Sequence, residues 1–332
     1  MSGGLQGICI VGAGRMGEGI ALAFMFAGLP VTLIDIKHRD AAAQARYFRE
    51  VEDHLRGELA TLVRLGSLDA AQAEQAMSHV RLCDREGSST CLQEAAVVFE
   101  AVPEVLELKT QTFAWLSEAC AAETVIASTT STFLVTQLAA LVTHPQRFVN
   151  AHWLNPAFLM PLVEVSRSDA TCPQVLQRLM ALLKRIGKVP VQCSPAAGYI
   201  VPRIQALAMN EAARMVEEGV ASAEDIDTAI RVGFGLRFSV LGMLEFIDWG
   251  GGDILFYASH YLAQAIDPRF LPPQVIADNM ALGRNGLREG EGFYDYREVD
   301  LEAYKLQRLG EFTRKLELMG LSPVFNGAVV TS

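Results

Sequence analysis

The sequence lacks the features that would tie a protein to a membrane or a metal ion. It contains no run of about 18 apolar residues, so we expect no transmembrane helix. Residues 1–4 do not begin a basic region followed by an apolar one, which argues against a signal peptide and for a cytoplasmic location. None of the six cysteines belongs to a CxxC pair, and no histidines cluster at metal-ligand spacing. We therefore expect reduced thiols and no metal site.

Positive charge is also scarce. The chain has 28 Lys and Arg against 38 Asp and Glu, which gives a formal net charge of −10. An acidic protein binds nucleic acids and anionic membranes poorly, so we expect neither as a partner. A small anionic ligand is compatible with this charge, because backbone N–H groups can bind it locally.

What the sequence does have is length and apolar content. Its 332 residues are 51% hydrophobic, which is enough for two domains with cores of their own. In the first half, short apolar runs alternate with helical patterns, for example at residues 15–27 and 105–119. Such alternation predicts parallel βαβ units and hence an α/β fold with a doubly wound, Rossmann-type sheet. The predicted strands cover residues 7–11, 31–34, 97–102, 124–128, 148–152 and 162–165.

Two further segments complete the predicted organisation. Residues 40–77 have a charged helical pattern with a Gly-Ser interruption, which predicts a helical hairpin arm. From Gly198 onward, almost only helical periodicity remains. We therefore expect a ligand-binding Rossmann domain over residues 1–194 and an all-helical domain over residues 195–332. The helical domain is apolar and too extended to bury itself, which favours a homodimer.

A glycine-rich loop follows the first predicted strand and opens the first predicted helix. It reads Gly12-Ala-Gly14-Arg15-Met16-Gly17, which is the spacing of a dinucleotide-binding loop. Gly12 permits the tight turn, a Cβ at Gly14 would collide with a pyrophosphate, and Gly17 lets the helix pack closely on the strand. The N-terminus of the helix supplies free N–H groups for the phosphates.

Asp35 lies at the end of the second predicted strand, 18 residues after Gly17. A carboxylate there accepts hydrogen bonds from the adenosine ribose and repels a 2′-phosphate, so NAD is favoured over NADP. Lys37, His38 and Arg39 could instead pair with a 2′-phosphate, or they could lie in a solvated loop. FAD uses the same kind of loop, but the sequence contains no second flavin signature.

A histidine and a carboxylate are candidates for the chemistry. His152 ends an apolar strand-like run, at the sheet edge where α/β proteins bind ligands. Histidine suits the removal of a hydroxyl proton, because it titrates near neutral pH. Glu164 lies inside an apolar run, where a carboxylate needs a partner. The two residues could form an acid–base pair, or they could be unrelated polar residues.

The segment that contains both residues resembles a family motif. It reads His152-Trp-Leu-Asn155-Pro-Ala-Phe-Leu-Met-Pro-Leu-Val-Glu164-Val and is similar to the HFFNP…LVEV motif of the L-3-hydroxyacyl-CoA dehydrogenases. The similarity extends from the glycine-rich loop to Gly292-Phe-Tyr-Asp-Tyr296. It implies an NAD-binding domain followed by a helical dimerisation domain. It also implies that His152 is the general base in oxidation and that Glu164 orients it.

The resemblance implies roles for four further residues. Ser131 would hydrogen-bond the reacting oxygen, and Asn155 would shape the site. Glu104 and Lys109 would lie near the nicotinamide and its ribose. Without the resemblance, Ser131 is typical of a loop or a helix cap, and Glu104 and Lys109 are typical of the first turn of a helix.

Two positions depart from the family pattern. Pro202 stands where the family has a substrate-binding asparagine, and proline offers no side-chain hydrogen bond. The segment Gly235-Leu-Arg237-Phe is more similar to relatives that act on free hydroxy acids, such as lambda-crystallin and L-gulonate 3-dehydrogenase. Arg237 could pair with a substrate carboxylate, or it could be a surface arginine at a helix end. The arm at residues 40–77, which faces CoA in the family, mixes arginines with acidic residues.

These observations lead to three hypotheses. The first is an NAD-dependent dehydrogenase of short-chain 3-hydroxyacyl-CoA substrates such as 3-hydroxybutyryl-CoA. The second is the same chemistry on a free 3-hydroxy acid. The third is a binding or structural protein that retains the dinucleotide site without turnover, and the presence of both His152 and Glu164 argues against it.

Overall fold

The structure is a computed structural model that describes residues 7–323. The chain divides into two compact units, residues 1–208 and residues 209–332. The expectation about a signal peptide at residues 1–4 lies outside the described part of the chain. Within that part, no helix is both long enough and apolar enough to cross a membrane.

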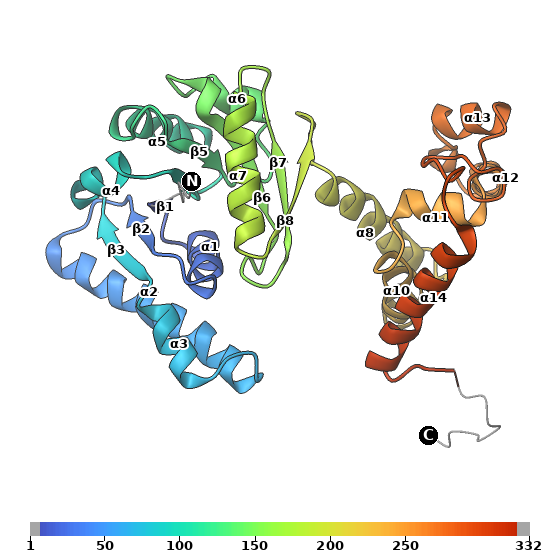
Figure 1. The fold of residues 1–332 in the computed structure, drawn as a ribbon, viewed down its shortest axis with the longest axis horizontal. Coiled ribbons are helices and arrows are strands. Elements are labelled where there is room, and N and C mark those ends of the chain that lie inside the picture. Colours follow the sequence, from blue (N-terminus) through green and yellow to red (C-terminus); the bar gives the residue numbers. More distant parts are fainter. Residues whose placement is uncertain (1–6, 324–332) are drawn as a thin grey trace. The chain divides into compact units, whose positions relative to one another are not determined.

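An eight-stranded sheet forms the centre of the first unit, as Figure 1 shows. Its order is β3-β2-β1-β4-β5-β6-β7-β8, and the first six strands in this order are parallel. The strand order reverses at β1, which confirms the predicted doubly wound, Rossmann-type sheet. The strands are β1 (Ile8–Val11), β2 (Val31–Asp35), β3 (Val80–Asp84), β4 (Val97–Glu100), β5 (Val125–Ser128), β6 (Phe148–Trp153), β7 (Leu162–Ser166) and β8 (Val189–Cys193).

The expected parallel pairing is wrong at one edge of the sheet. β6 and β7 pair antiparallel, because residues 154–161, which connect them, are too few for a helical crossover. β8 is parallel to β7 and therefore also runs against the first six strands. The sequence does not predict β3 or β8. Both are edge strands with mostly half-exposed or exposed residues, so their apolar pattern is weak.

Helices cover both faces of the sheet (Figure 1). One core contains Phe24 of α1, Leu55 of α2 and Leu179 of α7, and the other contains Leu92 of α4 and Phe113 of α5. The aspartates before α2 and α3 accept hydrogen bonds from N–H groups of the first turn, which explains why these helices begin there. The helices are α1 (Arg15–Phe26), α2 (Ala41–Arg64), α3 (Ala70–Met77), α4 (Ser89–Gln93), α5 (Leu106–Ala119), α6 (Val135–Ala139) and α7 (Pro173–Arg185).

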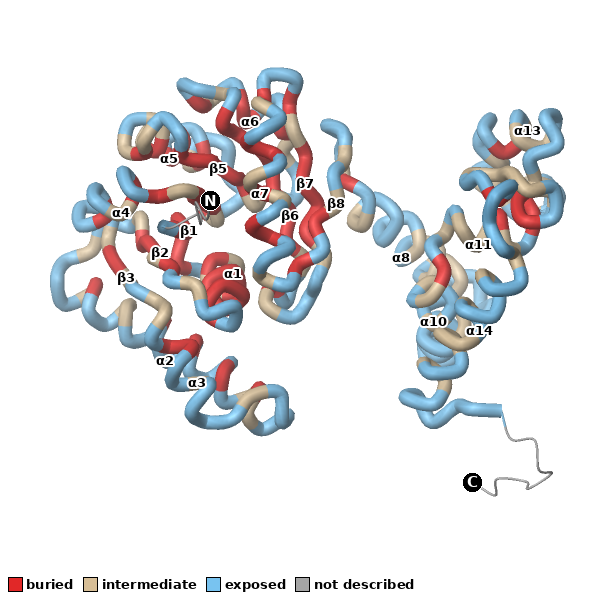
Figure 2. Tube along the Cα trace, in the orientation of Figure 1, coloured by how far each residue is buried: buried red, intermediate tan, exposed pale blue. Residues whose placement is uncertain are grey.

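The second unit is built from helices. Between residues 209 and 323, the only strand-like pairing consists of isolated bridges at Glu291, so the predicted all-helical domain is confirmed. Few of its side chains are buried (Figure 2). One of them, Asp248, accepts hydrogen bonds from the N–H groups of Phe293 and Tyr294, both at 2.9 Å. Its helices are the end of α8 (Val201–Glu217), α9 (Ala223–Ala229), α10 (Leu236–Phe238), α11 (Met243–Gly250), α12 (Gly252–Ala265), α13 (Gln274–Ala281) and α14 (Leu301–Leu318).

Candidate active site

A cavity of about 800 Å³ opens where the parallel strands of the first unit end. Loops that follow β1, β2, β4 and β5 line it, together with the end of β6. Ligands of doubly wound sheets bind in this position, because the loops diverge where the strand order reverses. The cavity brings together most of the predicted site residues, namely Gly12, Gly14, Arg15, Met16, Asp35, Glu104, Ser131 and His152.

The three glycines of the loop differ in what surrounds them. A Cβ on Gly17 would lie 1.9 Å from the carbonyl oxygen of Gly12, and Gly12 itself has a φ of +112°. The chain therefore requires both glycines for its own packing. A Cβ on Gly14 would meet no protein atom within 4 Å. The space beside Gly14 lies at the N-terminus of α1, which fits a dinucleotide pyrophosphate.

Asp35 ends β2 beside this loop and is buried. Its carboxylate accepts hydrogen bonds from Arg39 Nε at 2.8 Å, from the N–H of Lys37 at 3.2 Å and from Gln44 Nε2 at 3.3 Å. Arg39 is thus engaged with Asp35. The carboxylate is fixed at the position that recognises a ribose diol in dinucleotide-binding sheets.

His152 and Glu164 lie opposite each other in the antiparallel pair of β6 and β7. His152 Nδ1 is 2.8 Å from Glu164 Oε2, and the glutamate is fully buried. The other oxygen, Oε1, accepts hydrogen bonds from the N–H groups of Ile200 and Val201 at 2.8 and 2.9 Å. With Nδ1 bonded to the carboxylate, Nε2 is the ring nitrogen left for proton transfer. The connection that reverses the strand direction is therefore what joins the two residues.

Glu104 holds the turn that carries Ser131. Its carboxylate accepts hydrogen bonds from the Thr130 hydroxyl and from the N–H groups of Ser131 at 3.2 Å and Thr132 at 3.1 Å. Burial opposes ionisation of Glu104, but the hydroxyls of Thr130 and Thr132 and the charge of Lys109 lower its pKa. The turn that follows β5 is thus anchored to the loop that follows β4.

Lys109 lies behind Glu104 and is not among the residues that line the cavity. It is buried, with Nζ 2.9 Å from Glu100 and 3.2 Å from Glu104. Glu100, at the end of β4, was not a predicted site residue, although it is fully buried and also accepts a hydrogen bond from Ser128. A carboxylate that ends an apolar strand is the signal that could have found it. Tyr199, which stacks on His152, was missed as well.

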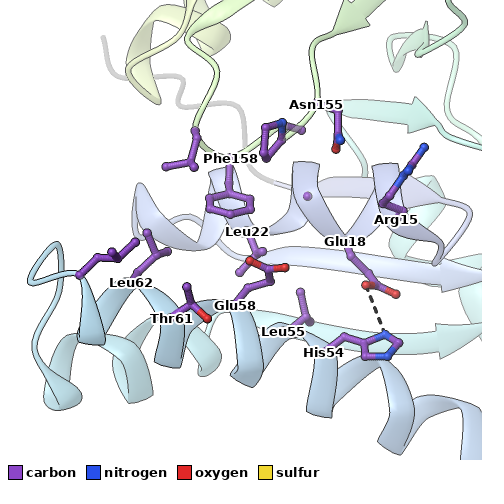
Figure 3. Close-up of a pocket in the computed structure, with 15 residues that line it drawn as sticks. Arg15, Glu18, Leu22, His54, Leu55, Glu58, Thr61, Leu62, Asn155 and Phe158 are labelled. Atoms are coloured by element: carbon purple, nitrogen blue, oxygen red, sulfur yellow. Dashed lines mark ion pairs between the residues drawn. The ribbon is translucent and has the colours of Figure 1, made fainter. Parts of the chain in front are cut away.

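Asn155 lines a second, smaller cavity of about 330 Å³. Figure 3 shows this cavity between α1, α2 and the loop after β6, with Asn155 and Arg15 at one end. Arg15 lines both cavities. Glu18 lies 3.6 Å from His54, and burial raises the pKa of this carboxyl despite the histidine. Glu58 adds a second carboxylate to the lining.

The two positions that depart from the family pattern lie on helices. Pro202 is in the first turn of α8, where its missing N–H costs nothing. Arg237 belongs to α10 in the second unit, and its guanidinium lies 4.6 Å from the centre of the Phe246 ring. The described contacts of Arg237 are thus compatible with either of its predicted roles.

The large cavity joins a place for a dinucleotide to a side chain suited to proton transfer, which is what a Rossmann-type dehydrogenase requires. Comparison with family models identifies the family of dehydrogenases. The 3-hydroxyacyl-CoA dehydrogenase NAD binding domain matches residues 7–196, and the C-terminal domain of the same enzymes matches residues 198–296. The chain belongs to the 3-hydroxyacyl-CoA dehydrogenase family and is an NAD-dependent oxidoreductase.

Individual relatives have different substrates in their names. The 3-hydroxyadipyl-CoA dehydrogenase of Escherichia coli K12 is 34% identical over 88% of this chain, which spans 59% of that protein. The 5-formyl-3-hydroxy-2-methylpyridine 4-carboxylate 5-dehydrogenase of Mesorhizobium japonicum is 28% identical over 92% of this chain and 95% of its own length. The crystal structure of a 3-hydroxyacyl-CoA dehydrogenase from Archaeoglobus fulgidus has a TM-score of 0.74 and 28% identity, covering 95% of this chain and 99% of that one. Family membership therefore does not define the substrate.

Proposed function

We propose that this protein oxidises a short-chain 3-hydroxyacyl-CoA, such as 3-hydroxybutyryl-CoA, to the 3-ketoacyl-CoA. The observation that carries the proposal is the hydrogen bond between His152 and the buried Glu164, beside the cavity that also contains the glycine-rich loop. A dehydrogenase needs a base for the hydroxyl proton within reach of its cofactor. His152 can serve as that base, because its side chain lines the same cavity as the glycine-rich loop.

In the proposed mechanism, His152 Nε2 takes the hydroxyl proton of the substrate in oxidation and returns it in reduction. Nδ1–H donates to Glu164, which fixes the ring orientation and stabilises the imidazolium that forms. The Ser131 hydroxyl donates a hydrogen bond to the reacting oxygen and holds it near Nε2. Asn155, in the loop after β6, shapes the entrance on the side of the smaller cavity, which Arg15 also lines. NAD, when bound, supplies the acceptor for the hydride.

The residues that would hold NAD follow from the same cavity. The loop from Gly12 to Gly17 and the N-terminus of α1 would bind the pyrophosphate, and Asp35 would bind the adenosine ribose. Glu104 lies beside the turn that bears Ser131, which supports a place near the nicotinamide. Lys109 would act through Glu104 and Glu100, because it is buried behind them.

A second candidate is the same reaction on a free 3-hydroxy acid, with Arg237 as the partner of its carboxylate. The smaller cavity favours this candidate, because its lining has the carboxylates of Glu18 and Glu58 beside Arg15 and His54. The adjoining groove adds the carboxylates of Glu50 and Asp53 and, among the described residues, no further basic side chain. Coenzyme A carries several phosphates, which a surface with an excess of carboxylates repels. The Mesorhizobium japonicum relative, whose name specifies a carboxylate without CoA, supports the same reading.

Side-by-side kinetics with NADH and two ketones tests the substrate. We expect acetoacetyl-CoA to be reduced with a kcat/KM at least about 100-fold above that of free acetoacetate, because binding energy from the remote CoA part lowers the barrier. Reduction of acetoacetate with no reduction of acetoacetyl-CoA would instead establish the second candidate. The control substrate is the acetoacetyl ester of 3′-dephospho-CoA. A higher kcat/KM for this ester than for acetoacetyl-CoA would show that the acidic groove opposes binding of the 3′-phosphate.

We also propose that the domain boundary lies near residue 194 and that the helical domain mediates a homodimer. The boundary is supported by family models that meet between residues 196 and 198. The dimer is supported by large exposed apolar side chains of the helical unit, namely Met209, Tyr261, Leu306 and Leu318, since protein interfaces cover apolar surface of this kind. The six free thiols support a reducing, cytoplasmic compartment.

Light scattering on the purified protein tests the dimer. We expect a mass twice the 36.1 kDa of one chain, because two copies can cover the apolar side chains that one copy exposes. Replacement of Leu306, which is 74% exposed on α14, by Glu should shift the mass toward one chain. Glu302 is also exposed on α14, and Glu302→Ala is the matched control, which should leave the mass unchanged. A monomeric mass for the unmodified protein at micromolar concentration contradicts the proposal.

A further inference from the structure

Tyr199 contacts His152 from the turn that precedes α8. The two rings are stacked, with centroids 4.8 Å apart and an angle of 17° between their planes. Tyr199 is buried, and its backbone has a φ of 46°. Residues other than glycine rarely adopt this left-handed conformation, and where they do the surrounding contacts must stabilise it.

The hydroxyl of Tyr199 makes two of these contacts. Tyr199 Oη donates to the carbonyl oxygen of Thr130 at 2.9 Å and accepts from Asn150 Nδ2 at 3.1 Å. Thr130 directly precedes Ser131, and Glu104 binds both residues of this turn. The ring of Tyr199 thus touches the histidine, and its hydroxyl binds the turn that carries Ser131.

The residues that follow Tyr199 contact the other member of the pair. The N–H groups of Ile200 and Val201 donate to Glu164 Oε1. Residues 199–201 therefore reach His152, its carboxylate partner and the Ser131 turn, which come from β6, β7 and the loop after β5. A single short segment connects every group that the proposed proton transfer uses.

We propose that Tyr199 is a positioning residue that fixes the ring plane of His152 relative to the turn that carries Ser131. This inference rests on the proposed function, in which these two side chains meet the reacting oxygen. Tyr199 itself acts through its neighbours, since its hydroxyl is used by Thr130 and Asn150. Small displacements of reacting groups carry large rate penalties, which is why such a contact matters for catalysis.

Two variants separate the ring from the hydroxyl. Tyr199→Phe keeps the stack and loses both hydrogen bonds, and we expect its kcat to fall about 3- to 10-fold. Tyr199→Leu loses the stack as well as the two hydrogen bonds, and we expect its kcat to fall about 100-fold with an unchanged KM for NAD. The NMR signals of the His152 ring should keep their wild-type positions in Tyr199→Phe and move in Tyr199→Leu, because only the leucine variant loses the aromatic ring stacked on the histidine.

Phe113→Leu is the matched control, because it also replaces a buried aromatic ring by leucine. Phe113 packs on Phe148 in the core that lies between α5 and the sheet. The Phe113→Leu substitution should lower thermal stability and leave both kcat and the NMR signals of the His152 ring unchanged. A wild-type kcat or unmoved His152 ring signals in Tyr199→Leu overturn the proposal. If Tyr199→Leu does not fold, an unchanged kcat in Tyr199→Phe overturns it. A wild-type protein inactive on every ketone tested refutes the proposed function instead, and the NMR signals of the His152 ring still decide whether Tyr199 acts on His152.

Discussion

His152→Ala should lower kcat roughly 10²–10⁴-fold, which is the usual contribution of a general acid–base. The reason is that His152 alone offers a ring nitrogen to the hydroxyl proton, while Glu164 is fully buried behind it. The affinity for NAD should be nearly unchanged, because the glycine-rich loop lies at the end of a different strand. Steady-state and single-turnover kinetics measure the two effects separately.

A second substitution at His152 distinguishes a loss of catalysis from a loss of folding. Alanine leaves Glu164 Oε2 without its partner, although Oε1 keeps two backbone donors. His152→Asn supplies an amide donor toward Glu164 and removes the titratable ring, so it should be as inactive as His152→Ala but more stable. His144→Ala is the control, since His144 is exposed. A wild-type kcat in either His152 variant removes this histidine from the mechanism.

Gly14→Val should raise the Kd for NAD at least about 100-fold, or about 2.8 kcal/mol, with little change in thermal stability. A Cβ here meets no protein atom within 4 Å, and the backbone angles of Gly14, φ −100° and ψ −174°, suit valine. The added side chain would therefore extend into the open space proposed for the pyrophosphate. Calorimetric titration with NAD and thermal unfolding without it measure both expectations.

Two other glycines serve as controls for this experiment. Gly17→Ala would place Cβ 1.9 Å from the Gly12 carbonyl oxygen, so it should destabilise the fold itself and not only NAD binding. Gly57→Ala, in α2, meets no atom within 4 Å and should stabilise the helix slightly without an effect on NAD. An unchanged Kd in Gly14→Val would show that the pyrophosphate does not approach this glycine.

The candidate cofactor site could be proposed from the sequence because its parts are local. The glycine loop joins one strand to the helix that follows it, and Asp35 ends the next strand. The apolar strands and the glycine spacing determine where these residues lie relative to each other, since consecutive βαβ units are right-handed and adjacent. His152 and Glu164 were identified by the same kind of signal, a polar residue within an apolar run.

The sequence was less informative where contacts come from distant segments. It predicted parallel pairing, but a short connection makes β6 and β7 antiparallel and places His152 opposite Glu164. The family resemblance implies a place for Lys109 near the cofactor, and only the structure shows that its ammonium group is buried against Glu100 and Glu104. Side-chain pairing of this kind depends on which loops converge, and no local pattern encodes that.

The sequence by itself determined the Rossmann-type sheet, the glycine loop and the acid that follows it, because short-range periodicity and spacing specify them. Only the tertiary structure decided that Asn155 lines a separate cavity and that Tyr199 lies against His152. These contacts join residues that are far apart in the chain or that lie on strands of opposite direction. They arise from the packing of strands and loops against one another, which fixes distances that sequence spacing leaves free.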